Sequence, residues 1–257
     1  MKSETKSRFL ERWNRYFGSA DLPVAYFYTD EVDGILSGEG ADGERCLIGH
    51  VDRVREDGCD YVYDLRTPGC PGGKRYSGFV NQLRPGFEYF LSCGIPGKLE
   101  GERYKKTPEL VSAFLEGHPF VEAPGRYLVF KRWDHLAERD EPLAVIFFAT
   151  PDVLAGLFTL ANYDLASEQG VVAPMGAGCA TILQYPLLEA TAEVPRCVLG
   201  MFDVSARPCV PAGTLTFTVP IRRLHQMVDN MDESFLITES WKHVLDRIQS
   251  AGRTPPR

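Results

Sequence analysis

Short apolar segments of strand length alternate with amphipathic segments of helical length along most of this 257-residue chain. Runs rich in Val, Ile, Tyr and Phe predict strands, and apolar residues at helical spacing predict helices. We expect strands at 23–28, 59–64, 87–92, 127–131, 143–148, 171–173, 196–202 and 214–219, and helices at 7–17, 46–54, 107–117, 151–162, 179–190, 220–231 and 241–248. This alternation favours an α/β or α+β fold with helices packed against a mixed β-sheet.

The chain shows no internal repeat, low-complexity run or long linker. A chain of this length suffices for one large domain or two small ones. We predict a single globular domain over residues 1–249. We also predict a flexible C-terminal tail over 250–257, because that stretch is polar and contains paired prolines.

Composition and charge exclude several classes of function. The formal net charge is −7, and no dense stripe of Lys and Arg is present, so we expect no binding to nucleic acid. No apolar run is long enough to cross a bilayer, and the polar N-terminus lacks the apolar core of a signal peptide. We therefore expect a cytoplasmic protein without a membrane partner. In that compartment its seven cysteines should be thiols or metal ligands rather than disulfides.

The segment 67–79, TPGCPGGKRYSGF, is the strongest candidate for a functional site. Cys70 lies among glycines and prolines and is followed by Lys74, Arg75 and Tyr76. A thiol on such a turn beside two cations has the surroundings that lower a cysteine pKa. Cys70 is therefore a candidate metal ligand or reactive thiol, and Arg75 and Tyr76 are candidates for binding a cofactor in the same cavity.

Other cysteines also lie at the ends of predicted elements. Cys46 and Cys179 open predicted helices after glycine-containing segments, and Cys197 begins a predicted strand. None of them forms the closely spaced pair that is typical of structural zinc sites. A dispersed set is compatible with an iron–sulfur cluster, whose ligands the fold gathers. It is equally compatible with buried, inert cysteines, which behave as small apolar residues.

Several motifs resemble those of one protein family. The stretch CPGGKRYSGF is similar to the CPGGxxxLGL motif of an uncharacterised prokaryotic family, domain of unknown function 169, which is common in archaea and anaerobic bacteria. Further segments resemble the family pattern in the same order along nearly the whole chain: PVAYFY, Arg45 with Cys46, GAGCAT, LGMFDVSAR and TFTVPIRRLHQMV.

The resemblance implies a four-thiolate site, because members of the family have a cysteine in each of four segments. An iron–sulfur cluster would be its natural occupant. Here the expected metal ligands are Cys46, Cys70 and Cys179, while the fourth position holds Met201, whose thioether is a poorer ligand. Cys197 or Cys209 could supply a fourth ligand from a shifted position, or the cluster is lost and the pocket kept for another ligand.

Arg207, in the SAR tripeptide, matches the arginine that follows the family's fourth segment. A guanidinium beside a cluster or an anionic ligand offers bidentate hydrogen bonds. Arg207 is therefore a third candidate for binding a cofactor, with a salt-bridged surface arginine as the alternative.

Three hypotheses of function follow. The first is a redox-linked cofactor-binding protein with thiolates around a metal or an iron–sulfur centre. Its partner would be a small molecule or a redox protein. The second is a metal-free enzyme or binding protein with a glycine-rich pocket near Cys70 and Arg207. The third is a scaffold or assembly module without a site. The residues leave the choice between an enzyme and a binding protein open, as they do the oligomeric state.

Overall fold

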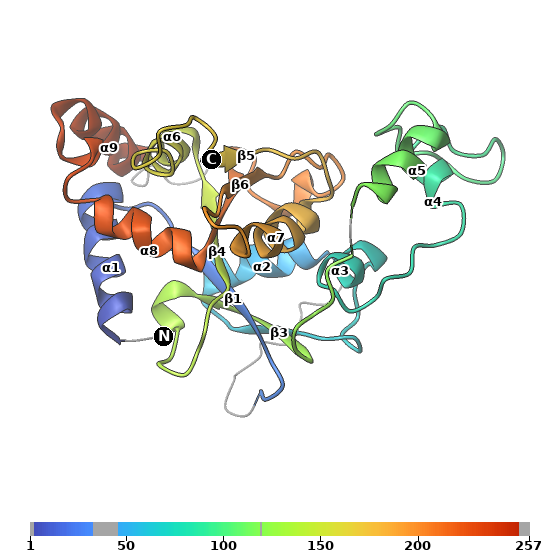
Figure 1. Cartoon of the computed structure of the whole chain (residues 1–257), viewed down its shortest axis with the longest axis horizontal. Helices are drawn as coiled ribbons and strands as arrows, with labels where there is room; N and C mark the ends of the chain where they lie inside the picture. The colour runs from blue at the N-terminus through green and yellow to red at the C-terminus, as the bar shows by residue number, and fades with distance from the viewer. Residues whose placement is uncertain (1–2, 33–45, 119, 252–257) are drawn as a thin grey trace.

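A seven-stranded sheet forms the centre of the molecule in the computed structural model, which describes residues 3–32, 46–118 and 120–251 (Figure 1). The strand order is β2-β3-β1-β4-β7-β6-β5. Neighbouring strands are antiparallel except β5 and β6, which are parallel. The strands are β1 (Val24–Thr29), β2 (Tyr61–Tyr63), β3 (Tyr127–Arg132), β4 (Ala144–Ala149), β5 (Val171–Val172), β6 (Cys197–Gly200) and β7 (Leu215–Pro220).

Helices cover both faces of this sheet. One layer contains α1 (Ser3–Phe17), α6 (Pro151–Leu160), α8 (Ile221–Asn230) and α9 (Glu239–Ala251). The other contains α2 (Leu47–Asp57), the π-helical turn η2 (Ala180–Gln184) and α7 (Tyr185–Ala190). Two short helices, α4 (Phe87–Phe90) and α5 (Pro108–Glu116), lie away from the sheet, beyond α3 (Pro71–Tyr76) (Figure 1). Three short 3₁₀ turns complete the described elements: η1 (Trp133–His135), η3 (Arg207–Cys209) and η4 (Phe235–Ile237).

The strand β4 shows why the sheet needs helices on both faces. All six of its residues are buried. Val145 and Phe147 enter the core beneath α1, whereas Ile146 and Phe148 enter the core beneath α2. A strand that is apolar on both sides must be covered twice. The predicted α/β architecture, a mixed sheet with packed helices, is confirmed.

The structure corrects one predicted element. Residues 87–92 were expected to form a strand, but Phe87–Phe90 is the short helix α4. It follows Gly86, whose φ of 73° lies in the left-handed region that favours glycine. The apolar pattern of this segment fits either type of element, and no strand of the sheet lies beside it to pair with. At the C-terminus, α9 continues to Ala251, while residues 252–257 of the predicted tail lie outside the described part.

The ion pair between the buried Arg223 and the more exposed Asp164 predicts a pH dependence of stability. Arg223 is almost fully buried, and its guanidinium donates to both carboxylate oxygens of Asp164 and to the carbonyl of Ala161. The hydrogen bond from Arg223 is the main reason why the pKa of Asp164 lies below its usual value of 3.8. Asp164 therefore contributes stability that is complete above the unfolded pKa and is lost as the pH falls through the lower folded pKa.

Asp164→Asn should be less stable than wild type near neutral pH, because Arg223 then lacks its charged partner. It should also lose less stability on acidification from about pH 6 to about pH 3. Urea unfolding at a series of pH values measures both effects. Asp246→Asn, at an exposed carboxylate without an ion pair in the described chain, is the matched control. Parallel pH profiles for Asp164→Asn and wild type would contradict the assignment.

Candidate functional site

Four cysteines from distant parts of the sequence line one cavity of about 620 Å³. Three of them, Cys46, Cys70 and Cys179, are the predicted metal ligands, and the fourth is Cys209. Cys59 and Cys93 are exposed and lie outside this lining. We call this space the thiol cavity. No cysteine of the chain forms a disulfide.

Two of these thiols are held at the beginnings of elements that the core anchors. Cys46 precedes α2, whose first residues, Leu47 and Ile48, are fully buried. Cys179 precedes η2, where Ile182 and Leu183 are fully buried. All four apolar residues belong to the same core beneath the sheet. The packing of this core therefore brings residues 46 and 179 to one place, although 132 positions separate them in the sequence.

Cys70 occupies the N-cap position of α3. Its Sγ accepts a hydrogen bond from the backbone N–H of Gly73 at 3.2 Å, and Pro71 takes the first helical position, where a missing N–H costs nothing. A Cβ at Gly73 would lie 3.0 Å from the hydroxyl oxygen of Tyr63. The glycine therefore lets α3 pack directly against Tyr63. This contact fixes the position of Cys70 at the start of the helix.

Asp64 and Lys74 stabilise the loop that leads to Cys70. The carboxylate of Asp64 accepts hydrogen bonds from the backbone N–H groups of Arg66 and Thr67 at 2.9 and 2.7 Å. The ammonium group of Lys74 donates to the carbonyls of Asp64 and Thr67 and lies 4.1 Å from the ring centroid of Tyr63. Burial lowers the pKa of Lys74. Lys74 thus binds its own loop and does not line the thiol cavity.

The buried thiol of Cys179 favours its neutral form. Burial raises its pKa well above the usual value, and negative charge on Cys70 or Cys46 raises it further. A cation bound in the cavity would reverse this balance, because a coordinated thiol gives up its proton.

The two predicted cofactor-binding residues of α3 both line the thiol cavity. The Nη1 atom of Arg75 donates to the backbone and side-chain oxygens of Asn81 at 2.6 and 2.9 Å. Its guanidinium lies 5.8 Å from the ring centroid of Phe120. Burial raises the pKa of Tyr76 to about 12, so its hydroxyl remains protonated at neutral pH.

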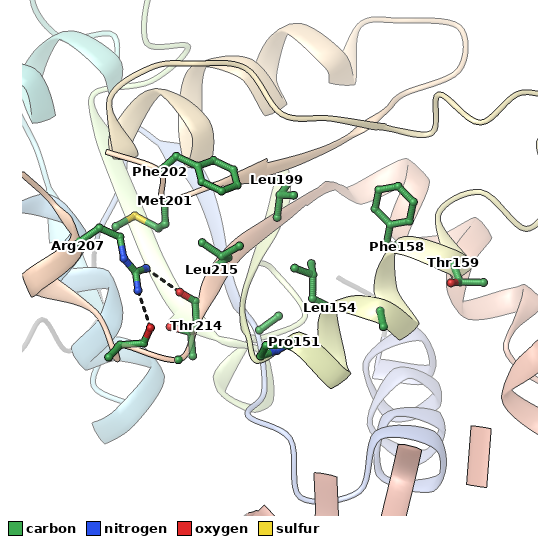
Figure 2. Close-up of a pocket in the computed structure, with 14 residues that line it drawn as sticks. Pro151, Leu154, Phe158, Thr159, Leu199, Met201, Phe202, Arg207, Thr214 and Leu215 are labelled. Carbon is green, nitrogen blue, oxygen red and sulfur yellow. Dashed lines mark hydrogen bonds between the residues drawn. The ribbon is translucent and has the colours of Figure 1, made fainter. Parts of the chain in front are cut away.

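Arg207, in contrast, lines a different cavity. Its guanidinium donates to the carbonyls of Thr214 and Ala212 at 2.7 and 2.8 Å (Figure 2). This second cavity, of about 910 Å³, is largely apolar and includes Leu154 and Phe158 of α6. The structure thus brings Cys46, Cys70, Cys179, Arg75 and Tyr76 together and leaves Arg207 outside that group. Here Arg207 stabilises the loop before β7.

The outer wall of the thiol cavity comes from a segment in which no sequence motif predicted a site. Residues 82–91 and 102–114, from the segment that contains α4 and α5, contribute Arg84, Phe90, Tyr104 and Lys105 to the lining. Only the tertiary structure shows that Tyr104 and Lys105 line the cavity whereas Lys106 is exposed and does not.

Asp203 links this outer wall to the Cys179 turn. Its Oδ2 accepts from the backbone N–H of Gly178 at 2.9 Å, and its Oδ1 lies 3.2 Å from the hydroxyl oxygen of Tyr104. The same Oδ1 accepts from the backbone N–H and the hydroxyl of Ser205. The carboxylate of Asp203 is therefore fully engaged in holding the site together.

The order of these segments in the chain agrees with one known family. The family model of DUF169, described as Uncharacterised ArCR, matches residues 15–230. This chain belongs to the DUF169 family. No curated protein and no solved structure matches it. In the described residues, no helix combines the length and apolarity that crossing a membrane requires.

The matched region of this DUF169 chain contains all four thiols of the cavity as well as Met201. Met201 stands where the family pattern quoted above has its fourth cysteine. It is buried, has a φ of 68°, and its Sδ lies 3.1 Å from the position of a Cβ at Gly178. Met201 therefore packs beneath the Cys179 turn but does not line the thiol cavity.

The structure distinguishes the two cysteines that could replace the fourth ligand. Cys209, at the end of η3, lines the thiol cavity. Cys197 lies in the core on the opposite face of the sheet, where its Sγ is 3.8 Å from the Sδ of Met227. In this DUF169 chain the fourth thiol of the cavity is thus Cys209, and Cys197 is a core residue.

His50, four residues after Cys46, does not line the thiol cavity. It is buried, and its ring stacks on Tyr61 with 4.4 Å between the centroids. Across residues 3–32, 46–118 and 120–251, no three side chains of His, Cys, Asp or Glu are arranged to hold a single metal ion. The four thiols therefore share a cavity without forming the compact ligand set of one ion.

Proposed function

We propose that this DUF169 chain binds a redox cofactor in the thiol cavity, with Cys46, Cys70 and Cys179 as thiolate ligands and Cys209 as the fourth. The observation that supports the proposal is the convergence of four thiols on one cavity from four segments, three of them at helix beginnings. Cysteines that served only as apolar filler would not need to share a lining.

The donor set fits an iron–sulfur cluster better than a single ion. Thiolates are the ligands that such clusters use. In a four-iron cluster each thiolate binds a different iron atom, so the ligands lie farther apart than those around one ion. In the described chain the four thiols share a cavity, and no three of them form a single-ion ligand set. When bound, the cluster would accept and donate single electrons.

The chain's own residues would control such a centre. Burial of Cys179 keeps water away from the inner side of the cavity. The backbone N–H of Gly73, bonded to the Sγ of Cys70, would stabilise a thiolate at that position. Hydrogen bonds to ligand sulfurs and exclusion of solvent are the main means by which a protein sets a cluster potential. A cytoplasmic location belongs to this proposal, because free thiols persist in reducing compartments.

The second candidate is a metal-free protein that binds a small organic molecule. The elevated pKa of Cys179 favours it, because a neutral thiol needs no cation. The volume of about 620 Å³ also lies within the range of about 300 to 1,000 Å³ that is usual for small-molecule sites. In this candidate the thiols would be part of the wall of the pocket, and Cys70 could act as a nucleophile.

Iron, zinc and acid-labile sulfide analysis of protein purified without oxygen, together with a visible spectrum, tests the first candidate. We expect iron and sulfide in near-equal, stoichiometric amounts and a broad absorption that bleaches on reduction. If the analysis finds zinc but no sulfide, the bound cofactor is a structural or catalytic zinc ion and not a cluster. A colourless, metal-free protein that also fails to take up iron and sulfide in an anaerobic reconstitution would overturn the cofactor proposal and favour the second candidate.

A further inference from the structure

The lining of the thiol cavity contains three cations without an acidic partner among the described residues. Arg75, Arg84 and Lys105 all line the cavity, and none forms an ion pair with a residue that the structure describes. Arg75 and Lys105 are half-buried and Arg84 is exposed, whereas other buried or half-buried cations such as Arg55, Lys131 and Arg223 are paired. Unpaired cations concentrated on one cavity attract negative charge into it.

Aromatic rings hold two of these cations and leave their hydrogen-bond donors available. The guanidinium carbon of Arg84 lies 3.6 Å from the ring centroid of Phe90, and the Nζ of Lys105 lies 4.9 Å from that of Phe114. Contact with a ring uses the face of a guanidinium and leaves its in-plane N–H groups to bind oxygen atoms bidentately. Neither side chain donates a hydrogen bond to an acceptor within the described part of the chain.

The two carboxylates of the same lining do not form ion pairs with these cations. Asp203 is already engaged by Gly178, Ser205 and Tyr104. Glu102 is exposed and makes no ion pair with the described residues. The lining thus holds three cations and two carboxylates, which is a formal excess of one positive charge.

We propose that Arg84 and Lys105, with Arg75 beside them, form a subsite for the anionic group of a small organic ligand, a phosphate or a carboxylate. The apolar body of this ligand would pack on the aromatic residues of the lining: Tyr76, Phe87, Phe90, Tyr104, Phe114 and Phe202. This inference rests on the proposed function only in using the same cavity. It names the chemistry of the molecule that meets the thiols there.

Binding of the fluorescent probe anilinonaphthalene sulfonate to the full-length protein tests this subsite. Its uncharged analogue, N-phenylnaphthylamine, reports the apolar part of the cavity alone. In the double variant Arg84→Gln with Lys105→Gln, the dissociation constant of the sulfonate should rise by at least about tenfold, because two charged donors are lost. That of the uncharged analogue should stay within about twofold. Unchanged binding of the uncharged analogue also shows that the cavity of the variant is intact.

The matched control is Arg53→Gln with Lys106→Gln, which removes the same two charges from exposed positions outside the cavity. It should leave the affinity for the sulfonate close to that of wild type. An equal loss of affinity in both double variants, or no loss in either, would overturn the subsite. A salt titration of the wild-type protein gives an independent measurement, since added salt should weaken binding of the sulfonate but not of the uncharged analogue.

Competition experiments identify the anion. Displacement of the sulfonate by phenyl phosphate more than by benzoate would assign a phosphate, and the reverse order a carboxylate. Benzyl alcohol should displace it much less than either, and equal displacement by the alcohol would contradict recognition of charge. These measurements need no metal, and Arg84→Gln with Lys105→Gln should retain the wild-type metal content. Failure of the subsite is thereby separated from failure of the cofactor proposal.

Discussion

Cys70→Ser should contain at least about tenfold less iron and sulfide than the wild-type protein when both are purified without oxygen. Serine is nearly isosteric with cysteine, and it is a preferred N-cap residue. It can therefore accept the hydrogen bond from Gly73 that Cys70 accepts and keep the start of α3. What the substitution removes is the thiolate, so the loss of cofactor should occur without loss of fold.

Cys93→Ser is the matched control for this experiment. Cys93 is exposed and does not line the thiol cavity, so its replacement should leave the iron and sulfide content unchanged. Thermal unfolding of the metal-free forms shows whether Cys70→Ser folds normally. A Cys70→Ser protein with its full complement of iron would remove Cys70 from the ligand set. Equal loss in both variants would point to oxidative damage during purification.

Trp13→Ala should lower the free energy of unfolding by about 3 to 5 kcal/mol, the usual cost of removing a buried indole. Trp13 is 2% exposed in the middle of α1. Its ring centroid lies 4.2 Å from that of Phe17 and 5.0 Å from that of Phe147 on β4. Its Nε1 donates to the carbonyl of Ala20 at 3.1 Å. Alanine would leave a cavity between α1 and the sheet and would remove the hydrogen bond to the carbonyl of Ala20, three residues beyond α1.

Urea unfolding followed by far-UV circular dichroism measures this change. Leu110→Ala, at a side chain that is 50% exposed on α5, should change stability by no more than about 0.5 kcal/mol. A loss below about 1 kcal/mol for Trp13→Ala would show that α1 contributes little to the stability of the sheet. That result would contradict the role assigned here to the aromatic residues on its buried face.

The local pattern of apolar residues was sufficient to predict most of the fold. Strands such as 143–148 are apolar on both sides, and helices such as 7–17 have apolar residues at helical spacing. This spacing of apolar residues is enough to predict a sheet that helices cover on both faces. The segment 87–92 could not be predicted in this way. Its pattern fits a strand or a helix, and only its position away from the sheet, after Gly86, decides for the helix.

For the site, sequence order and motif chemistry determined that Cys46 and Cys179 belong at the beginnings of helices, that Cys70 lies in a glycine-rich turn, and that all three are candidates for one centre. Family membership follows from the same linear pattern. These properties depend on residues that are close together in the chain, such as Cys70, Pro71 and Gly73.

Only the tertiary structure decided which further residues join these thiols. It places Cys209 on the thiol cavity and Cys197 on the opposite face of the sheet, because β6 lies between two separate cores. It directs Arg207 to the loop before β7, and it brings Arg84 and Lys105 to the cavity from a segment in which no motif predicted a site. Such contacts join positions far apart in the sequence, and the packing of the whole chain sets them, so no local pattern encodes them.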